Sequence, residues 1–159
     1  MNESLEEAIQ YAKKYIEDLL SFFGLNTDVH ATSEDDVIEL NIPSTHLNGF
    51  LIGQRGETVR AIQFLVSNAL KNQEFATTRV NVDVAEYKKQ RAEQLAETAE
   101  EWIKKVRESG EPYELKPMNA ADRRTIHKVA ADAGIVSDSV GEGRDRHIVL
   151  RAVAEKDDA

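Results

Sequence analysis

Cysteine is absent from this chain of 159 residues. Its absence excludes disulfides and thiolate metal sites, and it fits a reducing cytoplasm. No apolar run approaches the roughly 20 residues that a helix needs to cross a bilayer. The first seven residues are acidic and amphipathic, whereas a secretory signal has a basic start followed by an apolar stretch. We therefore expect a cytoplasmic protein with no secretory signal and no integral membrane segment.

Patterns that accompany catalysis are also missing. None of the four histidines forms a metal-ligand pair with a carboxylate or a second histidine at helical spacing, and we expect His30 and His147 to be ordinary surface or edge residues of strands. The sequence contains neither a phosphate-binding Gly-x-x-x-x-Gly-Lys loop nor a nucleophile elbow. We therefore expect no enzymatic activity, no cofactor, no metal and no small-molecule substrate.

Basic residues are outnumbered, because 20 Lys and Arg stand against 29 Asp and Glu and give a net charge of −9. This charge argues against nucleic acid, since attraction to phosphate is the main non-specific term in such binding. The acid excess is uneven, however. Residues 1–48 carry 2 basic and 10 acidic side chains, whereas residues 49–84 carry 4 and 3, and residues 112–151 carry 7 and 6. The balanced regions permit nucleic-acid binding without demanding it.

Hydrophobic periodicity predicts an α+β protein. The hydrophobic fraction of 41% suits compact packing, and the length suits one ordinary domain or two small ones. Apolar residues from Leu5 to Phe23 recur at spacings of three and four and share one face of a predicted helix. Alternating segments predict strands near 29–31 and 38–42, then a helix over 57–72 and a strand over 80–84.

The second half continues with a long charged helix over 85–109 that carries a thin apolar stripe. Trp102 and Tyr87 lie on that stripe, where we expect them to pack against a domain and not to stack on bases. Asn119 is a good N-cap for a following helix that ends at Gly134. Extended segments are expected at 113–115, 135–140 and 146–152, with a hairpin turn at 141–145.

The segment Gly53-Gln54-Arg55-Gly56 lies between an apolar run and a predicted helix. Two glycines allow a tight turn and a close approach of a phosphodiester, and the helix end presents unpaired N–H groups to that point. Arg55 adds a cation and Gln54 adds amide donors, and Arg60 is a further candidate contact. Taken alone, Gly-x-x-Gly is a weak signal whose ordinary interpretation is a loop with a helix cap.

The surrounding order of elements strengthens the signal. Helix, strand, strand, glycine loop, helix and strand resemble the KH domain of the prokaryotic type (type II, αββααβ), and the stretch from Gly49 to Leu65 resembles its signature. The resemblance implies a loop that clamps about four nucleotides of a single strand, with the bases in an adjacent apolar groove.

A second candidate site surrounds Arg123 and His127, which lie four apart on a predicted helix and so share a face. A guanidinium can grip phosphate or stack on a base, and an imidazole can stack or donate to phosphate. The ordinary interpretation is a structural histidine and a solvated arginine pair. The further basic candidates near this helix are Lys116, Arg124, Arg144 and Arg146.

Lys116-Pro117-Met118-Asn119, the Arg123-to-His127 segment and Gly141-Glu142-Gly143 resemble the R-three-H domain, which is named for an Arg-xxx-His motif and associated with single-stranded nucleic acid. The two domains in this order resemble the Jag (SpoIIIJ-associated) family of bacterial RNA-binding proteins. The resemblance implies a post-transcriptional regulator or RNA chaperone, and a small KH-only protein as a partner. Many family members carry a further small N-terminal domain, whereas we expect this chain to start at the KH domain. The expected parts are a KH domain at 1–84, a connecting helix at 85–110, an R-three-H domain at 111–152 and an acidic tail at 153–159.

Two other functions remain open. Both folds could serve as a protein-interaction scaffold with little RNA affinity, a role that the acidic residues 1–48 motivate. The protein could also bind single-stranded DNA, since only contacts with the 2′-hydroxyl separate RNA from DNA. Titration with labelled RNA and matched DNA would distinguish these possibilities.

Overall fold

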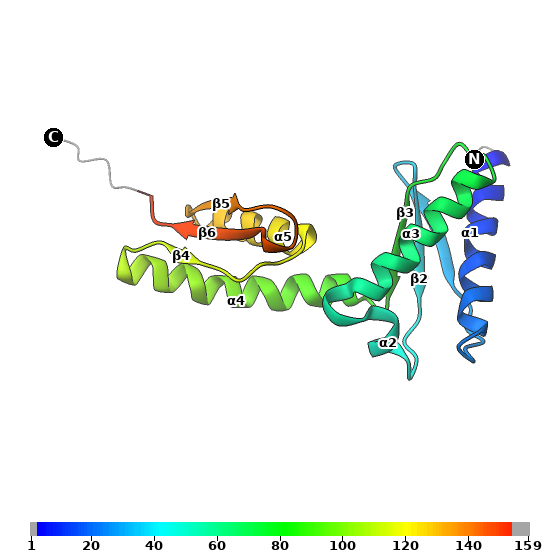
Figure 1. The fold of residues 1–159 in the computed structure, drawn as a ribbon, viewed down its shortest axis with the longest axis horizontal. Coiled ribbons are helices and arrows are strands. Elements are labelled where there is room, and N and C mark those ends of the chain that lie inside the picture. Colours follow the sequence, from blue (N-terminus) through cyan, green and yellow to red (C-terminus); the bar gives the residue numbers. More distant parts are fainter. Residues whose placement is uncertain (1–2, 154–159) are drawn as a thin grey trace. The chain divides into compact units, whose positions relative to one another are not determined.

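The structure is a computed structural model that describes residues 3–153. The chain is a mixed α+β protein, as the sequence predicted, and it separates between Lys88 and Lys89 into two compact units (Figure 1). The predicted acidic tail at 153–159 lies outside the described residues, apart from Val153. No helix in the described part of the chain is both long and apolar enough to span a bilayer.

The first unit places helices against a three-stranded sheet in the order β1-β2-β3. Strands β1 and β2 are antiparallel, whereas β2 and β3 are parallel, with Leu40 opposite Val82. A parallel pair needs a crossover connection, and here that connection contains α2, the glycine loop and α3. The elements in chain order are α1 (Glu3–Ser21), β1 (His30–Glu34), β2 (Val37–Ile42), α2 (Asn48–Ile52), α3 (Glu57–Asn72) and β3 (Val80–Val84).

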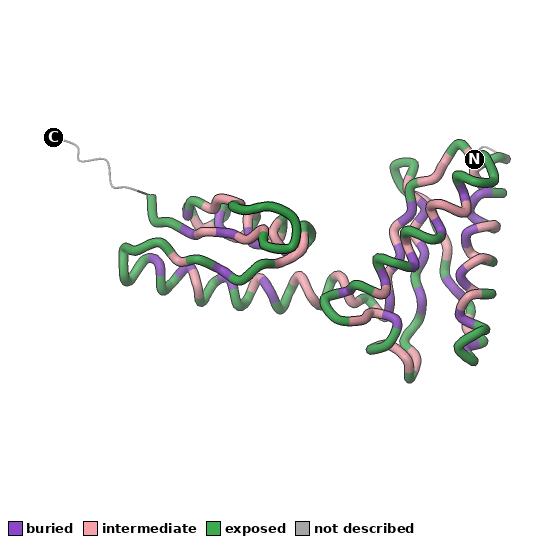
Figure 2. Tube along the Cα trace, viewed as in Figure 1, coloured by how far each residue is buried: buried purple, intermediate pink, exposed green. Residues whose placement is uncertain are grey.

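The core of this unit follows the two periodicities of the sequence. Buried positions recur along the helices and alternate along the strands, as Figure 2 shows. Phe23 departs from the predicted pattern, because α1 ends at Ser21 and leaves this ring 45% exposed. The helical core positions include Ala12, Ile16 and Leu20 of α1 and Val59, Ile62, Val66 and Leu70 of α3.

The second unit contains α4 (Tyr87–Ser109), whose first two residues belong to the first unit, and a three-stranded antiparallel sheet in the order β4-β6-β5. Most of α4 is a core helix of this unit and not merely a connector, because Leu95, Ala99, Ile103 and Val106 are buried in the second core. Trp102 is partly buried against the same core. The remaining elements are β4 (Tyr113–Glu114), α5 (Ala120–Asp132), β5 (Val136–Val140) and β6 (His147–Arg151).

Helix α5 begins where the sequence predicted. The Asn119 side chain caps it by accepting a hydrogen bond from the Asp122 N–H, with 2.9 Å between the heavy atoms. This bond satisfies one of the N–H groups that a helix start leaves without a partner. The Asp122 carboxylate is buried and pairs with Arg91 of α4 at 3.1 Å, so the start of α5 is tied to the long helix.

Candidate nucleic-acid interface

The glycine loop follows directly from α2, because the Gly53 N–H donates to the Gly49 carbonyl at 3.0 Å. Gly53 has φ 72° and ψ 177°, a region that is essentially confined to glycine. A Cβ at this position would overlap Thr58 Oγ1 and would lie 2.8 Å from the Thr58 backbone nitrogen. Glycine is therefore required here both by conformation and by the close approach of α3.

The tip of the loop is exposed, whereas its second glycine is buried. Gln54 and Arg55 form the tip as part of a short 3-10 turn, and Arg55 has φ 55°. Arg60 Nη1 donates to the Arg55 carbonyl at 2.7 Å, so this predicted contact residue also supports the loop. Gly56 is the N-cap of α3 and has no side chain that could accept from the first turn. The Glu57 N–H at the start of α3 donates to the Gln54 carbonyl, and Gly56 leaves the following N–H groups of the first turn without a side-chain cap.

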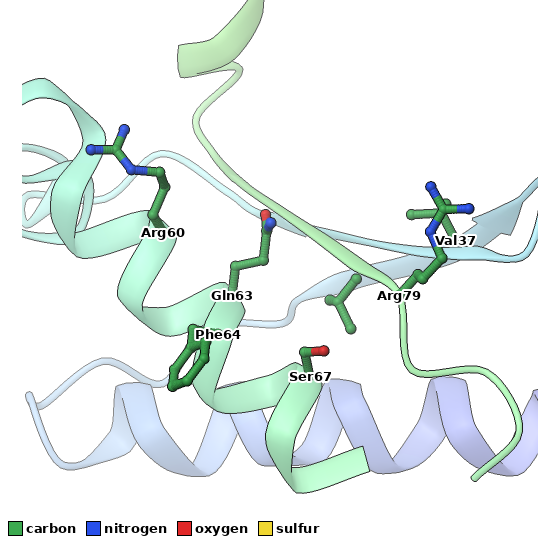
Figure 3. A pocket seen from close by; sticks show the side chains of 7 residues that line it. Val37, Arg60, Gln63, Phe64, Ser67 and Arg79 are labelled. Atoms are coloured by element: carbon green, nitrogen blue, oxygen red, sulfur yellow. The ribbon is translucent and has the colours of Figure 1, made fainter. Parts of the chain in front are cut away.

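A groove of about 520 Å³ runs beside α3 (Figure 3). Its α3 wall carries the guanidinium of Arg60 and the ring of Phe64, which is 66% exposed. Arg79, just before β3, adds a second guanidinium. The groove therefore combines cations with an exposed ring, which suits a polynucleotide strand. Its lining residues are Val37, Arg60, Gln63, Phe64, Ser67, Arg79 and Val80.

Sequence reasoning missed most of this groove. The α3 residues of its wall recur at spacings of three and four on the polar side of the helix, and that periodicity was a usable signal. Arg79 gave no comparable signal, because it reaches the groove only through the pairing of β2 with β3.

Lys88, close to the groove residue Gln63, is a further cation whose side chain has partners within the first unit. Its ammonium contacts Asn81 and donates to Gln63 Oε1 at 3.3 Å. Gln63 Oε1 also accepts from the Val82 N–H at 3.1 Å, which occupies a backbone donor on the edge strand β3. Burial lowers the pKa of Lys88, against the carboxylates of Asp83 and Glu39, which raise it. The ammonium group of Lys88 is therefore held by side chains of α3 and β3.

In the second unit, the backbone of Met118 forms hydrogen bonds with two of the predicted RNA-binding residues, Arg123 and Arg146. The Met118 carbonyl accepts from Arg123 Nη1 at 2.6 Å, and the Met118 N–H donates to the Arg146 carbonyl at 3.3 Å. Arg146 Nη1 in turn donates to the Gly141 carbonyl at 2.9 Å and closes the turn before β6. Arg123 and Arg146 thus carry structural hydrogen bonds, while Lys116, Arg124 and Arg144 are exposed.

His127 is held by β5. Its Nδ1 lies 2.6 Å from Ser137 Oγ, and its Nε2 lies 2.9 Å from Ser139 Oγ. The two serines alternate along the strand and so present the same face to α5. Both ring nitrogens therefore have hydroxyl partners, so donation to a phosphate would require one of these contacts to be exchanged.

His147 is more than an ordinary strand residue, which corrects the sequence expectation. Its Nδ1 donates to the Asp145 carbonyl at 2.8 Å, and its Nε2 lies 2.6 Å from Glu114 Oε1 on β4. The Asp145 hydrogen bond, followed by the Glu114 carboxylate, raises the pKa of His147 above its ordinary value of 6.5. The residue therefore ties β4 to the start of β6.

Comparison with known proteins yields matches to both the second unit and the chain as a whole. Residues 93–152 match the R-three-H domain. The chain is 30% identical over 145 residues to a Streptococcus pneumoniae protein named RNA-binding protein KhpB, covering 91% of this chain and 43% of that relative. It is 29% identical over 147 residues to the Bacillus subtilis protein of the same name, covering 91% of this chain and 70% of the relative. The chain thus spans less than half the length of the pneumococcal protein.

Proposed function

We propose that this chain, which carries an R-three-H domain and is similar over most of its length to RNA-binding proteins named KhpB, belongs to the Jag family and binds single-stranded RNA as a post-transcriptional regulator or RNA chaperone. The predicted resemblance to this family is confirmed by the matches to the second unit and to the chain as a whole. The cytoplasm is the proposed location.

The first unit is proposed to be a KH domain of the prokaryotic type. Two features support this assignment. The helix and strand order is αββααβ, and the sheet joins an antiparallel pair to a parallel pair. The glycine loop connects α2 with α3, where a KH loop would clamp about four nucleotides.

The observation that carries the proposal is the construction of that loop. Gly53 fits only as glycine, the tip exposes Gln54 and Arg55, and α3 begins behind a residue without a side chain. A phosphodiester can therefore approach backbone N–H groups at the positive end of a 16-residue helix. The net charge of −9 argues against binding of a polyanion. The charges that matter most for binding, however, are those within a Debye length of the phosphates, and the loop carries a cation there.

The second unit is proposed to contribute a separate contact through Lys116, Arg124 and Arg144, with Arg123, His127 and Arg146 shaping the surface. Exposed guanidinium and ammonium groups bind phosphates, and an imidazole face can stack on a base. Two weak sites on one chain raise each other's effective concentration, provided that one RNA can engage both.

A fluorescence anisotropy titration with labelled single-stranded RNA at low salt tests the proposal. We expect the wild-type chain to bind and the double substitution Gln54→Asp, Arg55→Asp to lose at least about tenfold in affinity, because it changes the loop by three negative charges. The matched control is Gln94→Glu with Lys104→Glu, which makes the same charge change on exposed positions of α4 and should bind nearly as well as the wild type.

Two variants of the titration address the other functions. Matched DNA oligonucleotides test whether the 2′-hydroxyl is recognised, and equal affinity would favour a general single-strand binder. Absence of binding to any oligonucleotide would instead support a protein-interaction scaffold. The proposed partnership with a small KH-only protein is tested by light scattering of an equimolar mixture, where a complex with the summed mass is expected.

A further inference from the structure

Most phenylalanines of this protein are exposed, although phenylalanine is usually buried. The sequence has five phenylalanines, and four of them are exposed, all in the first unit. Phe64 lines the groove already described, but the other three do not. Phe22 is 86% exposed, Phe23 45% and Phe50 53%. Such a group of exposed rings needs an explanation other than the core.

Two of these rings form an ordered pair. Phe23 and Phe50 meet edge to face, with 5.2 Å between their centroids and 63° between their planes. An edge-to-face contact at this distance is a favourable aromatic arrangement. The contact joins the segment after α1 to α2, so the exposed rings are held in place by each other and by two helices.

One ring of the pair belongs to the helix that ends at the glycine loop. Phe50 is three residues before Gly53, in a helix whose last turn closes on Gly53 itself. Three residues of helix rise about 4.5 Å, which is within the reach of one nucleotide from a phosphate held at the loop. A strand clamped by the loop would therefore bring a neighbouring base to these rings.

The charges near the rings and the loop are of both signs. The two carboxylates nearest in sequence to Phe22 and Phe23 both have lysine partners, since Lys14 pairs with Asp18 at 2.8 Å and Lys13 with Asp28 at 3.1 Å. These two ion pairs partly offset the acidic charge of α1 near its end. The cations of Arg55 and Arg60 lie at the loop, together with the carboxylate of Glu57 in the first turn of α3.

We propose that Phe23 and Phe50 form a stacking platform for one unpaired nucleobase of the RNA, directly beside the nucleotides that the glycine loop holds. This inference rests on the proposed RNA-binding function and adds a subsite to it. Stacking on an aromatic ring accepts any base, because every base has a π-face. The platform would therefore add affinity without sequence preference, and only for oligonucleotides that extend beyond the loop.

The test is a double-mutant cycle between protein and RNA. The probe is a labelled oligoadenylate of about eight nucleotides, twice the length that a KH loop clamps. Phe50→Leu keeps an apolar side chain but removes the ring, and it should weaken binding about tenfold, the usual effect of losing one stacked base. Phe50→Tyr restores a ring and should restore affinity. Leu65→Ala, at another exposed apolar position (44%, against 53% for Phe50), is the control and should have no effect.

An abasic nucleotide is then moved along the probe. At the stacked position it should weaken binding of the wild type about tenfold, yet have little further effect on Phe50→Leu, because both changes remove the same contact. Phe50→Leu at an exposed site should leave the thermal unfolding temperature nearly unchanged, and the tyrosine variant tests the ring independently of any loss of folding.

The failures of the two proposals are distinguishable. If Phe50→Leu binds every probe as the wild type does, while the loop variant Gln54→Asp, Arg55→Asp does not bind, the platform is wrong and the RNA-binding function stands. Strictly additive losses in the cycle would also overturn the platform. If Phe50→Leu keeps its RNA affinity but loses self-association or a protein complex, the rings are a protein-docking surface instead. If the wild type binds no probe, both proposals fail.

Discussion

Arg60 supports the tip of the glycine loop through the backbone of Arg55, with 2.7 Å between Nη1 and the carbonyl oxygen. Arg55 has φ 55° and ψ 27°, a conformation that costs a non-glycine residue about 1–2 kcal/mol. The side chain from the first turns of α3 therefore holds a strained residue at the point where a phosphate would bind.

Replacing Arg60 should loosen this tip. We expect Arg60→Ala to speed amide hydrogen exchange at residues 54–56 and to lower RNA affinity several-fold, because the loop is no longer preorganised. The unfolding free energy should change by less than about 1 kcal/mol, since the side chain is exposed. Arg60→Lys keeps the charge but not the planar fork, so it separates support of the loop from attraction to phosphate. Unaltered exchange in Arg60→Ala would show that the tip does not depend on this bond.

The two loop glycines should differ in their tolerance of alanine. At Gly53 the added Cβ would overlap the backbone of Thr58, and we expect Gly53→Ala to cost about 3 kcal/mol or more. At Gly56 the nearest atom to a Cβ is the flexible Arg60 Nη1 at 3.3 Å, so Gly56→Ala should cost about 1 kcal/mol, mainly from its positive φ. Hydrogen exchange at Val66 and Leu70, in the core of α3, measures both costs. Equal costs would contradict the observed packing.

His127 should keep its serine partners when RNA binds. Both ring nitrogens lie within 2.9 Å of hydroxyl oxygens, and exchanging those bonds for bonds to phosphate offers little net gain. We expect the ¹⁵N chemical shifts of the ring to remain nearly constant during an RNA titration, while the ring protons shift from stacking. Ser137→Ala with Ser139→Ala should release the ring and weaken binding. A large ¹⁵N shift in the wild type would instead indicate donation to phosphate.

The stability of the second unit should fall as pH rises through the pKa of His147. This pKa is raised in the folded state above its ordinary value of 6.5, so the protonated form is favoured by folding. The stabilisation is therefore fully present below pH 6.5 and is lost as pH rises through the raised folded pKa. Fluorescence of Trp102, the only tryptophan in the sequence, reports urea unfolding of this unit at each pH.

Glu114→Gln is the control for this pH dependence, because it removes the carboxylate that faces Nε2 while keeping a similar shape. The pH-dependent loss should be smaller in that variant. An identical pH profile in the wild type and Glu114→Gln would show that this carboxylate does not set the effect.

Much of the local structure could be read from the residues themselves. The helix over 57–72 and the strand over 80–84 have the predicted bounds, and Asn119 caps α5 as expected. These features depend on periodicity and capping, which involve residues within a few positions of one another. The motif positions of the loop and of the Arg-xxx-His helix were visible for the same reason.

The contacts of those motif residues were not visible. His127 meets serines ten and twelve residues away, and its spacing from Arg123 gave no sign of these partners. The helical period placed Phe23 on the apolar face of the first helix, yet α1 ends before it and the ring contacts Phe50.

By itself, the sequence determined which segments form helices and strands and where a glycine turn precedes a helix, because these depend on local backbone preferences and on the spacing of apolar residues. The tertiary structure alone decided that Arg79 lines the same groove as Arg60, that β5 occupies both nitrogens of His127, and that two phenylalanines meet beside the loop. Such contacts join residues distant in the chain, and they arise only when strand pairing and helix packing choose which faces meet.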